Sequence, residues 1–534
     1  MPALTDREAS LVRGLSVVSP ALYVAPFHRT HKNKPLDFKN NPCMREVYAD
    51  PSTDQTHIKS TQNGISEFLL ALLFGLCLSG RNVFHVMPTI QLSARFVRER
   101  FDKTAVYTSL YHSRMSGSSS GADNVGMKQV GMGTTAFVGS NSPSSFTEFV
   151  ADAYVIDEQD RCDESNVLMS EERLAASDLR MKIRSSNPTV TGRGIDLEYA
   201  STDQLEWHLR CDGGHYVLPD FFKHVVRQED DGVYVVVDAD WDPRSLQSPL
   251  GLPDARLVCD RCGRFLDRRG EGRWIPLNPG AGRRGRRYTK LHTTNVTLNE
   301  LLYRFSKAEG NDELMERFWN ADLGRAYDAP GARVTSAMID SCRGDWPLGQ
   351  VPADGFLVVG VDVGTFFNVA VLHGRYGTPG LRLVDAFACR DAQEVKEAVV
   401  RYGARCLVID GNPEPRTSRA ITALMPAGSV GLLCYYAKGR HDQVSGDVVT
   451  VDRTSALDNV KAAFATGGLG LPSNVDAVDG FYDQVEASTR IYDPDLNNGE
   501  GGYRWVEGSR PDHYFHAVGY ALIAARLLTM AGRQ

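Results

Sequence analysis

The stretch HIKSTQNGISEFLL, residues 57–70, decides the fold of the first half of the chain. It has the outline of a phosphate-binding loop, with a polar turn, Gly64 and Ser66 leading into an apolar helix. The consensus G-x-x-x-x-G-K-[ST] begins with Gly and places Lys directly before the final Ser or Thr. Here Lys59 stands first and Ile65 stands before Ser66. The stretch is either a nucleotide site whose lysine has moved or a loop that only has this outline.

The composition indicates a globular protein with more than one domain. A chain of 534 residues is too long for a single ordinary core, so we expect two or three domains. Apolar residues make up 42% and charged residues 23%, which is typical of soluble globular proteins. The apolar run at 68–78 is well short of the ~18 residues that a membrane span needs, and it predicts a buried helix. With a net charge of −7, any contact with nucleic acid has to be local.

Cysteine usage and the start of the chain bear on the compartment. The ten cysteines are scattered, with one close pair, which argues against a disulfide framework and favours a reducing cytoplasm. The N-terminus has no basic and then apolar leader, so we expect no signal peptide. These features predict a cytoplasmic protein without a membrane partner.

Changes of pattern along the chain predict five segments. Short β-like runs alternate with helical ones in the first half, which favours a parallel α/β sheet. A second α/β pattern opens on the apolar strand GFLVVGVDVG. The predicted segments are an irregular arm at 1–45, a nucleotide-binding core at 46–204, a zinc-ribbon-like insert at 205–280, a linker and helical region at 281–350 and a second α/β domain at 351–534.

Two adjacent carboxylates end an apolar strand in YVIDEQD, residues 154–160. In a P-loop ATPase the first acid of such a pair holds the Mg²⁺ shell and the second activates the attacking water. This assigns Asp157 to the metal and Glu158 to the general base. A strand that ends in a simple acidic turn is the other interpretation, and the loop at 59–66 favours the ATPase. Lys59 would then supply the missing cation by folding back over the β- and γ-phosphates, because a Lys stem is long and flexible.

Backbone and hydroxyl groups complete the predicted nucleotide site. Backbone N–H groups and the helix N-terminus do much of the phosphate binding, and Ser66 can still reach Mg²⁺. The turn RSSNPT, residues 184–189, follows the next strand. In motors of this kind such a turn senses the γ-phosphate and couples hydrolysis to movement, although alone it is an ordinary turn.

Three aspartates in the second half have the arrangement of a two-metal phosphodiesterase. Asp362 lies within the strand VVGVDVG, Asp410 ends the strand in LVIDGNPEPR, and Asp512 opens the final helix in RPDHYFHAVGYALIAA. A carboxylate on a buried strand is costly unless it is paired or metal-bound. In such enzymes two ions ~3.5–4 Å apart activate water and stabilise the leaving oxygen. Each acid alone also has a structural explanation, as a partner for a buried Arg, a turn former or a helix N-cap.

Two short motifs predict a zinc site between these regions. RCDGGHYVL and LVCDRCGRFL contain Cys211-x3-His215 and Cys259-x2-Cys262. C-x2-C followed by Gly is a good zinc knuckle, but the first half is weaker because Gly214 stands where a second Cys is usual. Bound zinc and a metal-free remnant with the same hairpins are both open.

A basic patch, RRGRRYTK at 283–290, has five cations in eight residues around Tyr288. This composition fits contacts with nucleic-acid phosphates. A solvated loop is the other open interpretation.

The order of these motifs resembles that of the large terminase subunit of tailed double-stranded DNA bacteriophages, nearest the lambda-like branch. The likeness covers roughly residues 45–530. No single string is decisive, but the succession is specific: KSTQNGISE, AFVGSNSPSSF before YVIDEQDRC, RSSNPTVTGRGI, CDGGH…CDRCG…GRW, FWNADLGRAYDAPGARVT, VGVDVG, VVTVDRTSALDNV and PDHYFHAVGYALIAA.

The resemblance implies an N-terminal P-loop ATPase of the additional-strand type and a C-terminal RNase H-like nuclease. Such enzymes cut concatemeric genome DNA and pump it into an empty procapsid. By position, Asp157 and Glu158 match the acidic pair, Ser186 to Thr189 the coupling motif, and Asp362, Asp410 and Asp512 the nuclease acids. The matching ATP loop consists of Lys59, Ser60, Thr61, Gln62, Asn63, Gly64, Ile65 and Ser66.

The resemblance also implies cofactors and partners. ATP and Mg²⁺ or Mn²⁺ are expected, with Zn²⁺ open. The implied partners are double-stranded DNA, the portal protein of the procapsid, the small terminase subunit and further copies of the chain in a ring on the portal, all in the host cytoplasm.

The chain departs from the family pattern at two positions. Ile65 replaces the usual cation, and His516 stands where the final motif usually has a second acid. His516 is either a metal ligand or a group that only supports the ligands.

Two other functions compete with a packaging motor. One is a non-packaging DNA helicase-nuclease or transposase-like enzyme that shares both folds. The other is a non-enzymatic scaffold, against which the intact Asp157–Glu158 pair argues.

Overall fold

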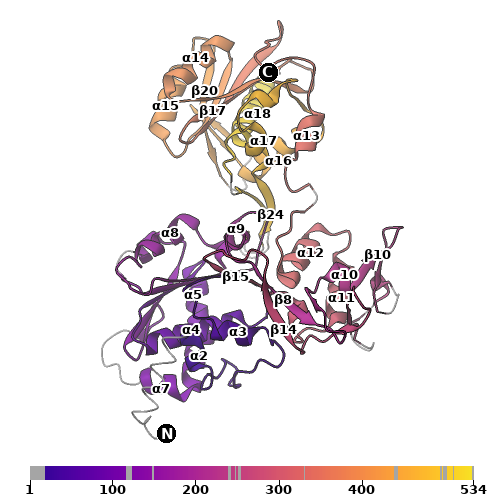
Figure 1. Ribbon diagram of the computed structural model, residues 1–534. Coiled ribbons are helices and arrows are strands. Elements are labelled where there is room, and N and C mark those ends of the chain that lie inside the picture. The colour runs from indigo at the N-terminus through magenta and orange to yellow at the C-terminus, as the bar shows by residue number, and fades with distance from the viewer. Residues whose placement is uncertain are drawn as a thin grey trace. The chain divides into compact units, whose positions relative to one another are not determined.

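The computed structural model divides into two compact units, Met1–Ala329 and Pro330–Gln534 (Figure 1). Each is an α/β unit in which helices cover both faces of one main sheet. No helix among the described residues is both long and apolar enough to cross a membrane. The structure describes residues 19–531 apart from 116–122, 147–148, 239–241, 247, 250–253, 330, 438–442, 494–495, 497–501 and 509.

The first unit is built on a mixed sheet with a parallel centre. The six central strands, from β15 to β5, run parallel, so their carboxyl ends lie at one edge of the sheet. In spatial order the strands are β14 (Gly272–Pro276), β8 (Leu205–Arg210), β15 (Arg284–Arg287), β1 (Asp54–Ile58), β7 (Met181–Ser186), β6 (Ala153–Asp157), β2 (Val83–Met87), β5 (Gly133–Gly139), β4 (Met127–Val130) and β3 (Asp123–Asn124), with β9 (Tyr216–Val217) paired to β8.

Alternating side chains of the central strands pack into two separate hydrophobic cores, one on each face of the sheet. On β6, Ala153 and Val155 belong to the cluster around α4, whereas Tyr154 and Ile156 belong to the cluster under α8. The helices of this unit are α2 (Pro20–Val24), α3 (Met44–Ala49), α4 (Ile65–Leu78), α5 (Ile90–Phe96), α6 (Asp102–Tyr107), α7 (Ser109–Met115), α8 (Glu164–Glu172), α9 (Gly194–Ala200), α10 (Phe221–His224), α11 (Leu298–Ala308) and α12 (Asp312–Arg317).

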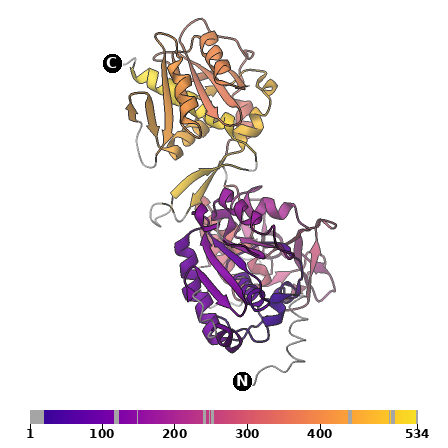
Figure 2. The same cartoon turned by 90° about the vertical axis from the view of Figure 1, so that its left-hand side faces the viewer.

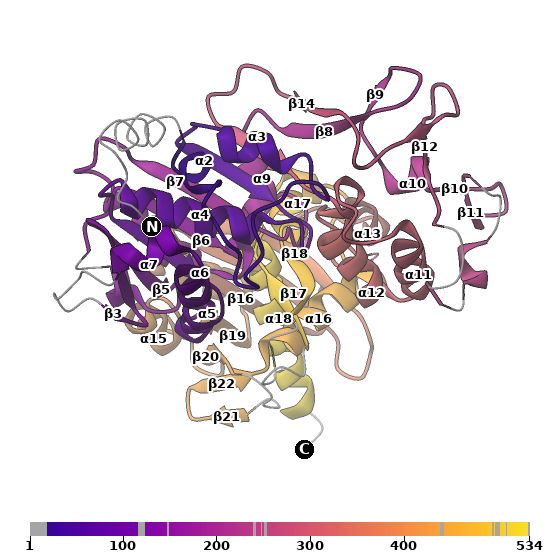
Figure 3. The same cartoon turned by 90° about the horizontal axis from the view of Figure 1, so that it is seen from below.

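The predicted buried helix is confirmed as α4, which is apolar on nearly all sides. Its outer side is covered by α2, which lies against it in the view of Figure 3. At Gly75 of α4, an added Cβ would lie 2.1 Å from the carbonyl oxygen of Pro20. The helices therefore approach to backbone contact.

Residues 19–45 differ from the irregular arm that we expected over 1–45. They form α2 and lead into α3, and the side chains of Ala21, Val24 and Met44 are buried in the same core as α4. The reason is that a helix as apolar as α4 needs cover on the side turned away from the sheet. Residues 1–18 lie outside the described residues.

The basic patch at 283–290 is a strand within the sheet, and the expectation of a solvated loop is wrong. β15 runs between β1 and β8, and Tyr288 is fully buried. Each of the five cations pairs with a carboxylate, so the patch does not offer free charge to nucleic-acid phosphates. The pairs are Arg283 with Asp54 and Glu198, Arg284 with Asp50 and Asp203, Arg286 with Asp50, Arg287 with Glu206, and Lys290 with Asp322.

The segment at 205–280 contributes to the same sheet. Its strands β8 and β14 pair antiparallel and extend the sheet beyond β15. Shorter antiparallel pairs in this segment are β10 (Val226–Gln228) with β11 (Tyr234–Val236) and β12 (Leu257–Val258) with β13 (Phe265–Leu266).

The second unit has the predicted RNase H-like arrangement. Three antiparallel strands lie on one side of the sheet, and further strands run parallel to β16 on its other side. In spatial order they are β21 (Gln443–Ser445), β22 (Val448–Val451), β20 (Val430–Tyr436), β19 (Cys406–Asp410), β16 (Phe356–Val363), β17 (Phe367–Gly374), β18 (Leu381–Cys389) and β23 (Leu469–Gly470). A separate hairpin pairs β24 (Thr489–Asp493) with β25 (Gly502–Val506).

Helices cover the two faces of this second sheet (Figure 2). Val358 packs with α16, α17 and α18 on one face, and Val359 packs with α14 and α15 on the other. The helices are α13 (Ser336–Ser341), α14 (Ala392–Tyr402), α15 (Pro415–Ala423), α16 (Arg453–Ala465), α17 (Phe481–Glu486) and α18 (His513–Ala531).

Gly360 sets the distance between β16 and α18. A Cβ at this position would lie 2.1 Å from the carbonyl oxygen of Ala517 and 2.2 Å from the backbone nitrogen of Ala521. Only glycine allows the helix backbone so close to the strand. Asp362 lies two residues further along, on the same face of the strand, and is therefore held under the start of α18.

Candidate functional site

The carboxyl ends of three neighbouring strands bring the predicted nucleotide-site residues together. Lys59 directly follows β1, and Asp157 is the last residue of β6. Between these strands lies β7, whose register pairs Ser185 with Asp157. Ser185 donates a hydrogen bond of 2.6 Å from its hydroxyl to the carboxylate of Asp157.

The ammonium of Lys59 lies on both acids of the predicted pair. Its Nζ contacts a carboxylate oxygen of Asp157 and lies 2.9 Å from Oε1 of Glu158. Only 5% of Lys59 is exposed. Burial opposes the charges of Lys59 and Asp157, but their attraction outweighs it, raising the pKa of Lys59 and lowering the pKa of Asp157. Lys59 and Asp157 are therefore held in their charged forms.

Glu158 has a backbone conformation that is rare for its residue type. Its φ of +60° and ψ of +46° lie in the left-handed region, where a side chain other than glycine is strained. Such strain persists only where the surroundings hold it, and it concentrates at functional sites. Here the contact with Lys59 helps to hold the turn after β6.

The first half of the loop at 59–66 is fixed to the body of the unit. Ser60 donates its backbone N–H to the carbonyl of Tyr288 at 2.9 Å, and Thr61 donates its own to Ala321 at 2.8 Å. The second half turns into α4. Gly64, with φ +93°, occupies the N-cap position. The remaining loop residues are Asn63, whose amide donates to the hydroxyl of Ser60 at 3.2 Å, Gln62, with φ +62°, and the half-exposed Ser66 in the first turn of α4.

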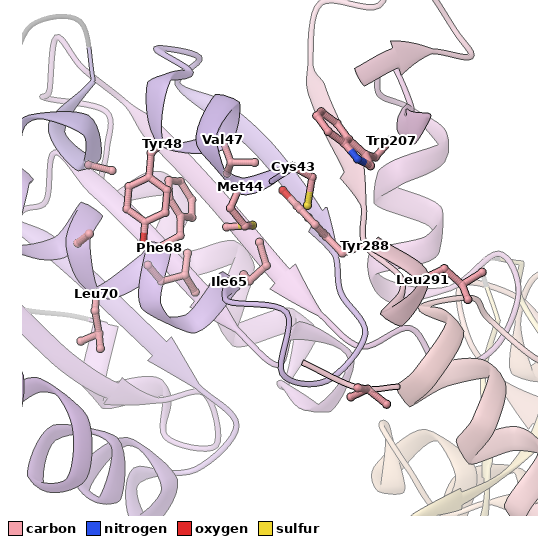
Figure 4. Packing of buried hydrophobic residues seen from close by; sticks show 14 of the residues in the cluster. Cys43, Met44, Val47, Tyr48, Ile65, Phe68, Leu70, Trp207, Tyr288 and Leu291 are labelled. Carbon is pink, nitrogen blue, oxygen red and sulfur yellow. The ribbon is translucent and has the colours of Figure 1, made fainter. Parts of the chain in front are cut away.

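Ile65 faces the core rather than the edge of the sheet. It is 1% exposed and belongs to the cluster that includes Met44, Val47 and Phe68, whose packing is shown in Figure 4. A lysine in this position would bury its ammonium among apolar side chains. This explains why the phosphate-loop cation cannot come from the usual position in this chain.

The coupling turn contacts the loop directly. Asn187 donates from its side-chain amide to the carbonyl of Lys59 at 2.9 Å. Ser186 is buried at the end of β7, and its hydroxyl accepts the backbone N–H of Asp160 at 3.1 Å. The turn therefore touches both the predicted phosphate loop and the acidic turn after β6.

In the second unit, the three predicted nuclease acids lie around the start of α18. Asp362 is on β16, Asp410 ends the neighbouring β19, and Asp512 directly precedes α18. Asp362 and Asp512 are buried, with 7% and 6% exposure. Burial and the charge of Asp362 raise the pKa of Asp410 to about 6. Two carboxylates that repel each other in this way favour a cation between them.

Sequence reasoning missed two side chains that contact these acids and one that contacts His516. The Nδ1 of His513 lies 2.8 Å from a carboxylate oxygen of Asp362, and this hydrogen bond raises the pKa of His513. Ser488 donates its hydroxyl to Asp512 at 2.5 Å. Tyr436 lies 3.3 Å from Nδ1 of His516. Only His513, as the residue after Asp512, gave a signal in the sequence.

His516, which stands in the place of the second acid, pairs with Asp512 one turn earlier. Their Nε2 and carboxylate oxygen lie 3.4 Å apart. Burial opposes the charge of both groups, but the pair raises the pKa of His516 and, with Ser488, lowers the pKa of Asp512.

The four predicted zinc ligands form a tight cluster. Among the described residues, Cys211, His215, Cys259 and Cys262 are the group of at least three His, Cys, Asp or Glu whose ligand atoms all lie within 4.8 Å of one another. The three nuclease acids do not form so tight a group.

The spacing within this cluster suits a tetrahedral metal. Cys211 Sγ lies 3.7 Å from Cys262 Sγ and 3.6 Å from His215 Nδ1, and the latter lies 3.9 Å from Cys259 Sγ. Zn–S bonds of ~2.3 Å at tetrahedral angles separate sulfurs by about 3.8 Å. Burial opposes ionisation of Cys211, but N–H donors from His215 and Gly213 lower the pKa of its thiol to about 6. The residues therefore fit zinc.

The fold and these sites define a P-loop ATPase joined to an RNase H-like nuclease. Two family models match the chain: the ATPase domain of the phage terminase large subunit gpA at residues 31–277, and the endonuclease domain of the terminase large subunit gpA at residues 284–372. Together they cover more than half of its length. The chain belongs to the family of phage terminase large subunits.

Solved structures with similarity to this chain include three from bacteriophages. The large terminase of the thermophilic bacteriophage D6E is 12% identical, with 92% of this chain and 99% of that chain covered and a TM-score of 0.31. The P22 large terminase nuclease domain is 12% identical, covering 39% of this chain and 98% of that chain, with a TM-score of 0.25. The large terminase nuclease of phage G20c, solved with bound cobalt, is 12% identical, covering 36% and 97%, with a TM-score of 0.24.

No curated protein matches the chain. The assignment therefore rests on the two family models. The chain is an ATPase and an endonuclease and acts in packaging phage DNA, and the non-packaging alternative is not favoured.

Restoring the consensus lysine provides a test of the loop geometry. We expect Ile65→Lys to lower the free energy of unfolding by several kcal/mol, because the change buries an unpaired ammonium. It should not raise the rate of ATP hydrolysis, since Lys59 already lies on the acids. Thermal unfolding and steady-state ATP hydrolysis measure the two effects.

The matched control is Ile65→Val, which should cost about 1 kcal/mol and leave hydrolysis unchanged. A stable Ile65→Lys variant with faster hydrolysis would contradict this account of the loop.

Proposed function

We propose that Lys59 supplies the cation of the ATP site, that Asp157 is the magnesium ligand and that Glu158 is the general base. The observation that carries this proposal is the contact of the Lys59 ammonium with both acids. Lys59 is the only cationic residue of the loop at 59–66, and a long, flexible lysine stem would allow its ammonium to turn from the acids toward a phosphate. Residues 59–66 would surround the phosphates.

The geometry supports a simple exchange of partners. Without nucleotide, the ammonium of Lys59 offsets part of the negative charge of Asp157 and Glu158. With ATP present, its ammonium moves to the β- and γ-phosphates, and Glu158 is released to accept a proton from water. The water oxygen then forms the new bond to the γ-phosphorus while the bond to the bridging oxygen breaks, giving ADP and phosphate. Mg²⁺, held by Asp157 and Ser66, would neutralise charge that develops on the phosphate oxygens.

We further propose that Asp362, Asp410 and Asp512 hold Mg²⁺ or Mn²⁺ for DNA cleavage. The raised pKa of Asp410 and the burial of the other two support a cation at this place. The metal would activate water and stabilise the leaving oxygen of the phosphodiester. His516 and Ser488 fix the orientation of Asp512, and His513 contacts Asp362 from the exposed side.

We propose a structural Zn²⁺ for Cys211, His215, Cys259 and Cys262. All four positions of a tetrahedral ion are then filled by protein, which is typical of structural rather than catalytic zinc. Gly213 supports this wrapping, because a Cβ there would lie 2.9 Å from the sulfur of Cys262. The metal would fix the segment that connects β8 to β14.

The partners follow from the family. We propose that the chain assembles as a ring on the portal protein of the procapsid, receives double-stranded DNA through the small terminase subunit and works in the host cytoplasm. Stimulation of ATP hydrolysis by procapsids or by the small subunit would support this role.

The ATP site is tested by steady-state hydrolysis with purified chain. We expect Lys59→Ala and Glu158→Gln each to lower kcat by at least about 100-fold, because one removes a phosphate cation and the other the base. Lys182→Ala is the matched control, since Lys182 of β7 pairs with Glu171 of α8, away from the loop. Normal hydrolysis by Lys59→Ala beside an inactive Glu158→Gln would show that the cation comes from elsewhere.

The nuclease acids are tested by plasmid cleavage in Mn²⁺. We expect Asp362→Asn to lower the cleavage rate at least about 100-fold, since it removes a charged metal ligand. The same variant should lose Mn²⁺ affinity by calorimetry and keep its ATP hydrolysis. Asp385→Asn, at a β18 carboxylate that accepts a hydrogen bond from Tyr402 of α14, should cleave normally. Wild-type cleavage by Asp362→Asn would refute the assignment.

The zinc proposal is tested by metal analysis of the purified chain. We expect about one zinc ion per chain, reduced in Cys262→Ser together with the melting temperature, because structural zinc contributes to folding free energy. Cys342→Ser, at a cysteine outside the cluster, should keep its zinc. A chain that folds fully without metal would support the metal-free remnant instead.

A further inference from the structure

Asp160 lies two residues after Glu158 and has no role in the site described so far. One oxygen of its carboxylate accepts two bonds from Thr189, from the backbone N–H at 3.0 Å and from the hydroxyl at 2.9 Å. The other oxygen accepts the backbone N–H of Ile195 at 2.7 Å. Its own N–H donates to the hydroxyl of Ser186. Asp160 is therefore bonded to both ends of the coupling turn, Ser186 and Thr189.

The fold makes a specific place for this carboxylate. Gly194 has φ +52°, and a Cβ there would lie 2.4 Å from a carboxylate oxygen of Asp160. A side chain at position 194 would push Asp160 away from Ile195. Burial raises the pKa of Asp160 to about 6, against the effect of its three donors. The buried carboxylate of Asp160 is thus held by N–H and O–H donors of Thr189 and Ile195.

The coupling turn continues the connection to the last residues of the first unit. Tyr327 donates its backbone N–H to the carbonyl of Thr189 at 3.1 Å. Thr191 donates its N–H to the carboxylate of Asp328 at 3.3 Å. The first unit ends at Ala329, so both contacts lie within its last three residues. A continuous route of bonds runs from the acidic turn through Asp160 and Thr189 to Tyr327.

We propose that Asp160 is a positioning residue that ties the turn bearing Glu158 to Thr189, so that a change at the ATP site reaches Tyr327. This inference rests on the proposed role of Glu158. A carboxylate suits the task because it accepts bonds from several donors at once and has no donor to compete with them. The strained backbone of Glu158, two residues before, is the part of this route that can relax when its partner Lys59 moves to a phosphate.

The test is Asp160→Asn in the full chain. The asparagine keeps the shape but turns one acceptor into a donor that faces an N–H. We expect kcat for ATP to fall at least tenfold while KM and the affinity for ATPγS stay within twofold. In the wild type, ATPγS should change amide hydrogen exchange in a peptide containing Tyr327, and in Asp160→Asn this change should be lost. A residue that only supported the fold would not separate kcat from nucleotide affinity.

The matched control is Asp163→Asn. Asp163 also accepts a backbone N–H, from Asn166 at 3.0 Å, but it caps α8 and does not contact the coupling turn. Its variant should keep the ATPγS response at Tyr327. Thr189→Val removes only the hydroxyl bond, so it is a milder probe should Asp160→Asn unfold. The double variant Asp160→Asn/Thr189→Val should be no slower than Asp160→Asn, because both substitutions disrupt the same contact between Asp160 and Thr189.

A wild-type response at Tyr327 in both Asp160→Asn and Thr189→Val, or additive losses in the double variant, would overturn the inference. The exchange measurement uses ATPγS and needs no hydrolysis, so it decides the role of Asp160 by itself. Failure of the proposed ATP site would be seen separately, as wild-type hydrolysis in Lys59→Ala and Glu158→Gln.

Discussion

A buried ammonium between two carboxylates organises the first unit. An unpaired charge at the depth of Lys59 or Asp157 would cost several kcal/mol, so these two groups must remain together or exchange for other charged partners. Their contact fixes the ends of β1 and β6 on either side of β7. It also explains why Ile65 is tolerated. With the proposed cation at the end of β1, the position before Ser66 is free to turn inward and add apolar surface to the core around α4.

In the second unit, histidines rather than a lysine pair with two of the buried carboxylates. Burial and the nearby charge of Asp362 raise the pKa of Asp410. Histidines on the first turns of α18 provide partners for Asp362 and Asp512. Their approach depends on Gly360, which lets the helix backbone lie directly on β16. The packing of one helix thus sets the spacing of the charges, and a divalent cation is the partner that such a set of carboxylates favours.

The sequence predicts side chains whose place follows from the ends of secondary-structure elements. Asp157 and Asp410 could be placed because both end apolar strands, and the Cys-His cluster because its spacing is local. The place of the basic stretch at 283–290 inside the sheet does not follow from composition, because its partners, such as Asp50 and Asp203, are far away in the chain. For the same reason, the burial of residues 19–45 against α4 and the contacts of Asp160 could not be foreseen. Pairing between distant segments is a property of the folded chain.

Two separate hydrogen bonds connect the proposed ATP site to one short stretch of chain, residues 321–327. Thr61 of the phosphate loop bonds to Ala321, and Thr189 of the coupling turn bonds to Tyr327. Between them, Gly324 with φ +63° lies so close to the carbonyl of Tyr288 that a Cβ there would be 2.2 Å away. A stretch held at both ends and packed at backbone distance cannot absorb a shift of one end without moving the other. Hydrogen bonds worth about 0.5–1.5 kcal/mol each are enough for this, because coupling between sites typically amounts to ~1–3 kcal/mol. The last stretch of the first unit is therefore bonded both to the proposed phosphate loop and to the proposed coupling turn.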